Sequence, residues 1–169
     1  MRWLVWGVAT CLMAAAATAN LMHVEGFNWT AGDFLVMGMM LSLACSIYEL
    51  GAKLSASTFY RAGFGLCVLT GFLTAWITLA VGIISEAQEQ ANVLFGAVLL
   101  VGIVGSLLAR FRPQGMARAS FASAVTQAVV AAIAAAIEPT HPEGWIVSGC
   151  LAGMWLAAAA LFRRSARSD

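Results

Sequence analysis

The sequence predicts an all-α fold, a polytopic transmembrane helical bundle with six spans and both termini in the cytoplasm. Of its 169 residues, 62% are apolar and only 10% are charged, whereas soluble domains carry roughly 25% charged residues. Mean hydropathy is +0.87, so lipid is the expected solvent for this much apolar surface. Short polar loops separate the apolar runs, and the basic residues fall in alternate loops. We therefore expect a single transmembrane domain over residues 1–169.

The first expected span covers residues 3–21 and allows two interpretations. As a retained helix, it has Arg2 as a cytoplasmic anchor and tryptophans at the membrane interface. As a signal peptide, it has a short positive start, an apolar centre and a small-residue cleavage site at residues 17–19. We expect retention, because a cleaved chain would begin with another helix within about a dozen residues. The intact mass of the purified protein distinguishes the two.

The second span is expected over residues 34–54. Its end carries Glu49 and Lys53 at i,i+4 spacing, which predicts that the two charges pair near the membrane edge. A stripe of small residues predicts a face that another helix can approach closely. This stripe consists of Gly38, Ser42 and Ser46.

The third and fourth spans, over residues 62–85 and 91–109, form a membrane hairpin that ends at Pro113. The first arm has a polar face composed of Cys67, Thr70, Thr74 and Thr78. The second arm has glycines at Gly102 and Gly105, which favour close helix packing.

The fifth and sixth spans are expected over residues 119–137 and 144–162. The fifth contains Gln127, the deepest strongly polar side chain in any span. The sixth has a GxxxG pattern at Gly149 and Gly153, which is typical of close helix packing in membranes.

Charge segregation fixes the expected topology. With six spans, all basic residues fall on one side of the membrane: Arg2, Lys53, Arg61, Arg110, Arg112, Arg118, Arg163, Arg164 and Arg167. Most acidic residues fall on the other side: Glu25, Asp33, Glu86, Glu89, Glu138 and Glu143. Cytoplasmic loops are enriched in Lys and Arg, so both termini are expected inside. A five-span or seven-span count would break this segregation.

Composition and motifs argue against several functional classes. No basic patch or zinc-knuckle spacing indicates nucleic-acid binding. Nucleophile-elbow, zinc-protease, P-loop and dinucleotide patterns are absent from the sequence, so we expect no enzyme activity. His23 and His141 fall in separate loops without nearby ligands, and the four cysteines lack CxxC spacing. We therefore expect no metal ion, haem or other cofactor.

The polar residues within the spans leave two functional hypotheses open. Glu49 fits an interfacial ion pair, but acidic residues in membranes also mark ion or proton paths. Gln127 lies nine residues beyond Arg118, as Thr70 lies nine beyond Arg61. This equal spacing allows a Thr70–Gln127 hydrogen bond between the helices if their two faces meet.

The first hypothesis is a non-catalytic accessory or assembly component, or a homo-oligomer, whose partners are the lipid bilayer and another membrane protein. The second is a small transporter or permeation protein with a polar path. That path would involve Glu49, Gln127, Thr70 and Thr74. Convergence of these side chains on one interior site would favour transport, whereas separate helix contacts would favour the accessory role.

Several strings together resemble a family of small, uncharacterised bacterial inner-membrane proteins. They are NWTAGDF, IYELGAK, YRAGFG, LAVGIISE followed by AN, and ARFRPQGMARA. The resemblance covers about residues 28–127. It implies a multi-pass protein of the bacterial inner membrane and implies no activity, substrate or cofactor.

Overall fold

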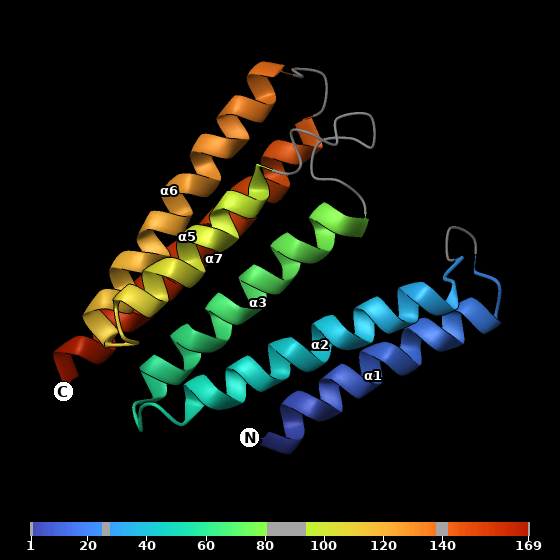
Figure 1. The fold of residues 1–169 in the computed structure, drawn as a ribbon, viewed down its shortest axis with the longest axis horizontal. Coiled ribbons are helices and arrows are strands. Elements are labelled where there is room, and N and C mark those ends of the chain that lie inside the picture. Colours follow the sequence, from blue (N-terminus) through green and yellow to red (C-terminus); the bar gives the residue numbers. More distant parts are fainter. Residues whose placement is uncertain (1, 25–27, 81–93, 138–141, 169) are drawn as a thin grey trace. The chain divides into compact units, whose positions relative to one another are not determined.

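The computed structural model describes residues 2–24, 28–80, 94–137 and 142–168, and every regular element in these ranges is an α-helix (Figure 1). The helices are α1 (Arg2–Leu21), α2 (Ala31–Ala52), α3 (Thr58–Ala80), α5 (Phe95–Leu108), α6 (Pro113–Ile137) and α7 (Pro142–Ser168). Five of them are long and apolar enough to cross a membrane, and α5 is a shorter apolar helix of 14 residues. The chain divides into two compact units, Met1–Leu50 and Gly51–Asp169.

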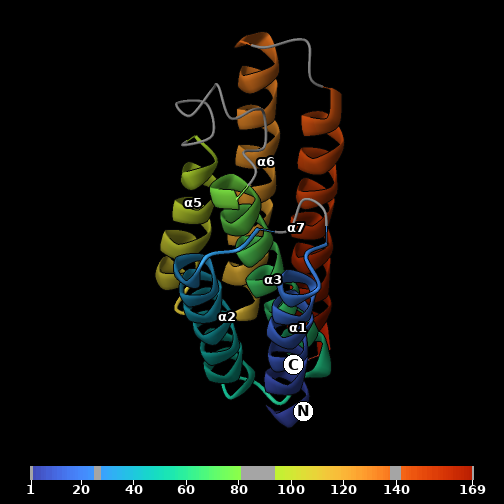
Figure 2. The same cartoon turned by 90° about the vertical axis from the view of Figure 1, so that its right-hand side faces the viewer.

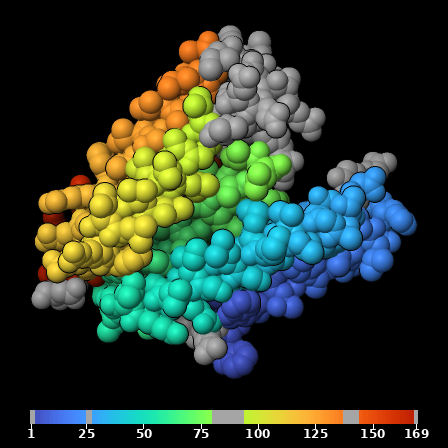
Figure 3. Space-filling model, viewed as in Figure 1, coloured from blue at the N-terminus to red at the C-terminus, as the bar shows by residue number. Residues whose placement is uncertain are grey.

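The first unit is an antiparallel hairpin of α1 and most of α2, whose surfaces lie side by side (Figures 1 and 3). Contacts at successive levels define its register. The Trp6 indole N–H donates to Glu49 Oε1 over 2.7 Å. Further along, a Cβ added to Gly38 would lie 3.9 Å from the Met13 methyl group. Residue numbers rise along α1 while the numbers of the contacting residues fall along α2, as expected for an antiparallel pair.

Side-chain hydrogen bonds hold the loop end of this hairpin. The Asn20 amide donates to the Trp29 carbonyl over 3.1 Å and accepts from the Trp29 backbone N–H over 3.0 Å. Thr30 then caps α2, because Asp33 Oδ2 accepts from both the Thr30 backbone N–H and its hydroxyl. The end of α1 and the start of α2 are therefore linked by side chains that satisfy backbone groups left unpaired at helix ends.

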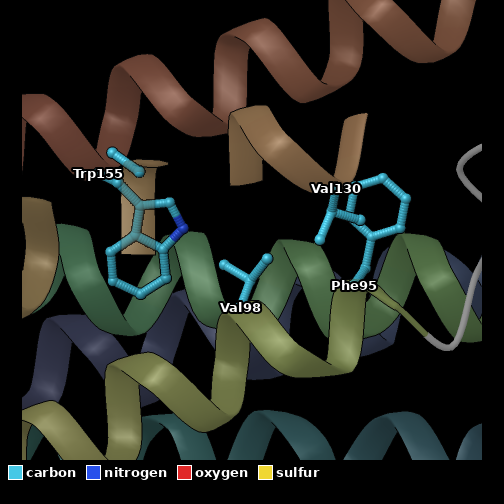
Figure 4. Packing of buried hydrophobic residues seen from close by; sticks show 5 residues of the cluster. Phe95, Val98, Val130 and Trp155 are labelled. Atoms are coloured by element: carbon cyan, nitrogen blue, oxygen red, sulfur yellow. The ribbon is translucent and has the colours of Figure 1, made fainter. Parts of the chain in front are cut away.

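The second unit packs α3, α5, α6 and α7 alongside one another (Figure 2). Helix α7 packs against both α3 and α6, and α5 packs mainly against α6. The buried apolar cluster consists of Phe95, Val98, Ala124, Val130 and Trp155 (Figure 4). This core therefore draws on α5, α6 and α7.

Tyr60 of α3 contacts α7 and the α5–α6 turn at one end of the second unit. Its side chain is fully buried and its hydroxyl donates to the Phe111 carbonyl over 2.8 Å. Its ring packs edge-to-face on Phe162, with centroids 5.2 Å apart. At the same end, the Ser165 hydroxyl lies 3.1 Å from that of Ser57. The start of α3, the α5–α6 turn and the end of α7 therefore meet here.

The α5–α6 turn has an uncommon backbone. The Phe111 backbone N–H donates to the Ser106 carbonyl, and the Arg110 backbone N–H donates to the Leu107 carbonyl. This bonding pattern is a Schellman motif, whose left-handed position is usually glycine. Here Arg110 occupies that position with φ 47°, followed by Phe111 with φ 57°. Pro113 then begins α6, at the first helical position that proline favours.

The predicted span boundaries need correction at several ends. Helix α6 begins at Pro113, not at residue 119, because proline after the turn starts a helix as well as ending one. Helix α7 continues to Ser168, beyond the predicted end of the sixth span at residue 162. Helix α3 begins at Thr58, ahead of the predicted start at residue 62. Parts of the predicted hairpin, residues 81–85 and 91–93, lie outside the described residues.

Candidate functional site

Glu49 lies in the first unit, where it accepts the Trp6 N–H described above. On the same face of α2, Cys45 is buried and its thiol lies 3.9 Å from the Val5 carbonyl. Helix α2 ends at Ala52, so Lys53 falls in the following turn and its side chain is exposed. Glu49 is thus part of the hairpin contact between α1 and α2.

The small-residue stripe of α2 faces in more than one direction. Gly38 faces Met13 of α1, whereas Ser42 and Ser46 are exposed. The Ser46 hydroxyl donates to the Ser42 carbonyl over 2.7 Å. The buried side chains of α2, Leu41 and Cys45, lie on a neighbouring face instead.

Thr70 and Thr74 are fully buried in the second unit. The Thr70 hydroxyl donates to the Leu66 carbonyl over 2.7 Å, and the Thr74 hydroxyl donates to the Thr70 carbonyl over 2.9 Å. Thr78 repeats the pattern on Thr74. Each of these three threonine hydroxyls therefore donates to a backbone carbonyl of its own helix, the usual arrangement for threonine in apolar helices.

The Thr70–Gln127 hydrogen bond that the spacing allowed does not form. Gln127 is fully buried, and neither Nε2 nor Oε1 has a hydrogen-bond partner among the residues that the structure describes. The equal spacing from the arginines misleads, because Arg118 lies well inside α6 whereas Arg61 lies in the first turn of α3. The Cys67 Sγ and Ser120 Oγ atoms lie 3.2 Å apart, so these two residues are at the same height along α3 and α6. Counting equally from that contact (67 to 74, 120 to 127) brings Gln127 level with Thr74.

Other buried polar atoms of the second unit also lack hydrogen-bond partners in the described part of the chain. They are Ser123 Oγ on α6, and Ser148 Oγ and Trp155 Nε1 on α7. A Cβ added to Gly102 of α5 would lie 3.2 Å from Ser123 Oγ and 3.4 Å from the Trp155 ring. Three helices therefore meet around Ser123, one helical turn before Gln127. The i,i+4 spacing of Ser123 and Gln127 is the sequence signal that would have linked them.

The remaining packing glycines differ in their surroundings. A Cβ added to Gly105 would lie 2.8 Å from the Ala119 Cβ, so α5 and α6 are in close contact there. Gly149 and Gly153 are exposed, and a Cβ at either position would meet nothing within 4 Å. Among the described residues of the second unit, nothing packs closely on the GxxxG face of α7.

Within the described part of the chain, no group of three or more His, Cys, Asp or Glu side chains could hold a metal ion. The four cysteines are free thiols. His141 lies outside the described residues. The buried unpaired side chains of the second unit carry neutral amide, hydroxyl and indole groups, which can bind a molecule by hydrogen bonding.

No protein-family model, curated protein or solved structure matches this chain.

Proposed function

We propose that this chain is an integral protein of a bacterial inner membrane, with six spans and both termini in the cytoplasm. The long apolar helices α1, α2, α3, α6 and α7 support five of these spans. Helix α5 would be the sixth, since it runs between α3 and the sharp turn into α6. Its 14 described residues extend about 21 Å. The bacterial setting rests on the family resemblance of the sequence.

The grouping of basic side chains supports this topology. Contacts around Tyr60 bring the start of α3, the α5–α6 turn and the end of α7 together at one end of the second unit. That end carries Arg61, Arg110, Arg112, Arg118, Arg163, Arg164 and Arg167. Such enrichment is expected on the cytoplasmic side.

Impermeant maleimide labelling of single-cysteine variants tests the topology in spheroplasts. The chain would carry serine at its four native cysteines. Ala56→Cys and Gln114→Cys report on the arginine-bearing end, whereas Gln88→Cys and Thr140→Cys report on the opposite loops. We expect labelling of the second pair in intact spheroplasts, and of the first pair only after permeabilisation. Labelling of both pairs from outside would contradict the six-span arrangement.

For function, we propose a non-catalytic accessory or assembly component that packs against a second protein or a second copy. One observation carries this choice: Glu49, Thr70 and Thr74, which were expected to line a path, each make a hydrogen bond within their own unit. Glu49 accepts from Trp6 in the first unit, and the threonine hydroxyls donate to their own helix in the second. Gly149 and Gly153 leave an open face on α7 for close packing.

Native mass spectrometry after mild-detergent extraction tests this role. We expect the chain in a complex of fixed stoichiometry, with a second copy or another membrane protein. Gly149→Leu with Gly153→Leu should weaken that complex, because bulky side chains would block close helix approach. The matched control is Gly7→Leu, since a Cβ there also meets nothing within 4 Å. A monomer that alone carries solute flux in proteoliposomes would overturn the proposal.

The second candidate is a small transporter, and the unpaired Gln127 amide favours it. Buried polar groups in membrane helices commonly mark substrate pathways. A reconstituted chain that speeds movement of an uncharged solute, and loses this in Gln127→Leu, would establish transport. Glu49→Gln should leave such flux unchanged, because Glu49 belongs to the α1–α2 contact.

A further inference from the structure

We infer that α5, α6 and α7 surround a binding site for one small uncharged molecule that carries both a hydrogen-bond donor and an acceptor. The site is defined by Ser123, Gln127 and Trp155. This inference does not depend on the proposed topology or accessory role, because it rests only on buried groups inside the second unit.

Gln127 provides the strongest evidence. Its side chain is fully buried, and both its amide nitrogen and its carbonyl oxygen lack partners in the described structure. A primary amide has two donor hydrogens and an acceptor oxygen with two lone pairs. Leaving all of them unpaired in an apolar interior is costly, so such groups normally bind a protein group or a bound molecule.

Ser123 departs from the rule followed by its neighbours. On the same helix, Ser120 donates to the Met116 carbonyl and Thr126 donates to the Ala122 carbonyl. These back-bonds are the simplest way to satisfy a hydroxyl in an apolar helix. Ser123 Oγ is buried without such a bond, so its hydroxyl is available to a molecule between the helices.

Trp155 adds a donor from a second helix. Its indole N–H is buried without a partner, although buried tryptophans usually find one. Figure 4 shows the indole nitrogen on the side of the ring that faces Val98 and Val130. On the third helix, Gly102 has no side chain, and this leaves the Ser123 hydroxyl and the Trp155 ring against the backbone of α5.

The chemistry of these groups selects the ligand class. Gln127, Ser123 and Trp155 offer neutral donors and acceptors and no charge. An ion would lack a counter-charge among them, and burying an unpaired charge is strongly unfavourable. Phe95, Val98 and Val130 supply an apolar surround. A small amide or alcohol matches this set, and a single water molecule offers the same donors and acceptors in the smallest form.

Tryptophan-labelled NMR of the full chain in detergent tests the site. The Trp155 indole signal would be assigned by its loss in Trp155→Phe, and acetamide would be the probe. We expect a saturable shift of the Trp155 signal in the wild type, and at least a tenfold loss of apparent affinity in Gln127→Leu. Gln114→Leu is the matched control, because this glutamine lies exposed on the same helix. The exposed Trp145 should not respond.

A direct magnetisation-transfer peak from water to the Trp155 indole proton, without an acetamide shift, would identify water as the bound molecule. Both results require an occupied site. A dry site would show neither signal, and Gln127→Leu would then raise the thermal midpoint, because leucine removes an unpaired amide. That combination would overturn the inference.

Discussion

The Tyr60 hydroxyl donates to the Phe111 carbonyl over 2.8 Å, although the two residues lie 51 positions apart. Phe111 has a left-handed backbone with φ 57°. The bond therefore ties the first turn of α3 to the turn between α5 and α6. Since Tyr60 is fully buried, its hydroxyl and the Phe111 carbonyl depend on each other for hydrogen bonding.

Tyr60→Phe should destabilise the protein by about 1–2 kcal/mol, because it removes one hydrogen bond and leaves a carbonyl unsatisfied. The free energy of unfolding would be measured by SDS titration in mixed micelles. Tyr48→Phe is the control, because no described hydrogen bond involves the Tyr48 hydroxyl. Equal stability of Tyr60→Phe and the wild type would show that water replaces the bond.

Arg110→Gly should stabilise the protein by about 0.5–1 kcal/mol. A left-handed residue with a side chain costs roughly 1–2 kcal/mol, and part of the gain is offset by the greater freedom of glycine in the unfolded chain. Arg112→Gly is the matched control, because it removes a charge in the same turn without relieving a positive φ. Chemical unfolding of both variants measures the difference, and a less stable Arg110→Gly would contradict the backbone argument.

Gly51→Ala should lower the free energy of unfolding by about 1–3 kcal/mol through overpacking. A Cβ on Gly51 would overlap the ring of Phe64, which is buried and stacked on Tyr60, with ring centroids 6.1 Å apart. The Phe64 ring also lies beside the Phe111 ring, with centroids 6.4 Å apart. Gly149→Ala is the control, since its Cβ meets nothing within 4 Å, and alanine there should be neutral or slightly stabilising. Partial recovery in Gly51→Ala with Phe64→Leu would confirm the clash.

The sequence predicted where the helices lie, because apolar runs in lipid leave few alternatives to a helix. Their ends were harder, since residues 113–118 and 163–168 are polar and nothing in hydropathy requires them to be helical. In the structure, Pro113 starts α6. Ser165, whose hydroxyl contacts that of Ser57, lies in the last turns of α7, beyond the predicted end of the span. The register between helices could not be predicted, because it depends on contacts such as Cys67–Ser120 between distant segments.

Trp6 and Glu49 should show a coupling free energy of about 1 kcal/mol in a double-mutant cycle of Trp6→Phe and Glu49→Leu. Hydrogen bonds between membrane helices average about 0.6 kcal/mol, and a charged acceptor strengthens the bond. The same SDS titration measures the four variants. Trp3→Phe is the control, because Trp3 is 87% exposed on the same helix. A coupling near zero would mean that the 2.7 Å bond is exchanged freely for water.

Thr70→Val and Thr74→Val should change the free energy of unfolding by less than about 1 kcal/mol each, despite complete burial. Each hydroxyl donates to a carbonyl that already accepts a helical bond, so its removal leaves no essential donor unpaired. Valine preserves the branched shape and volume of threonine. Both variants should also keep the wild-type affinity of the Trp155 response to acetamide, which Gln127→Leu is expected to weaken at least tenfold. Loss of that response in Thr74→Val would instead place the Thr74 hydroxyl in the ligand site, level with Gln127, and would extend the site onto α3.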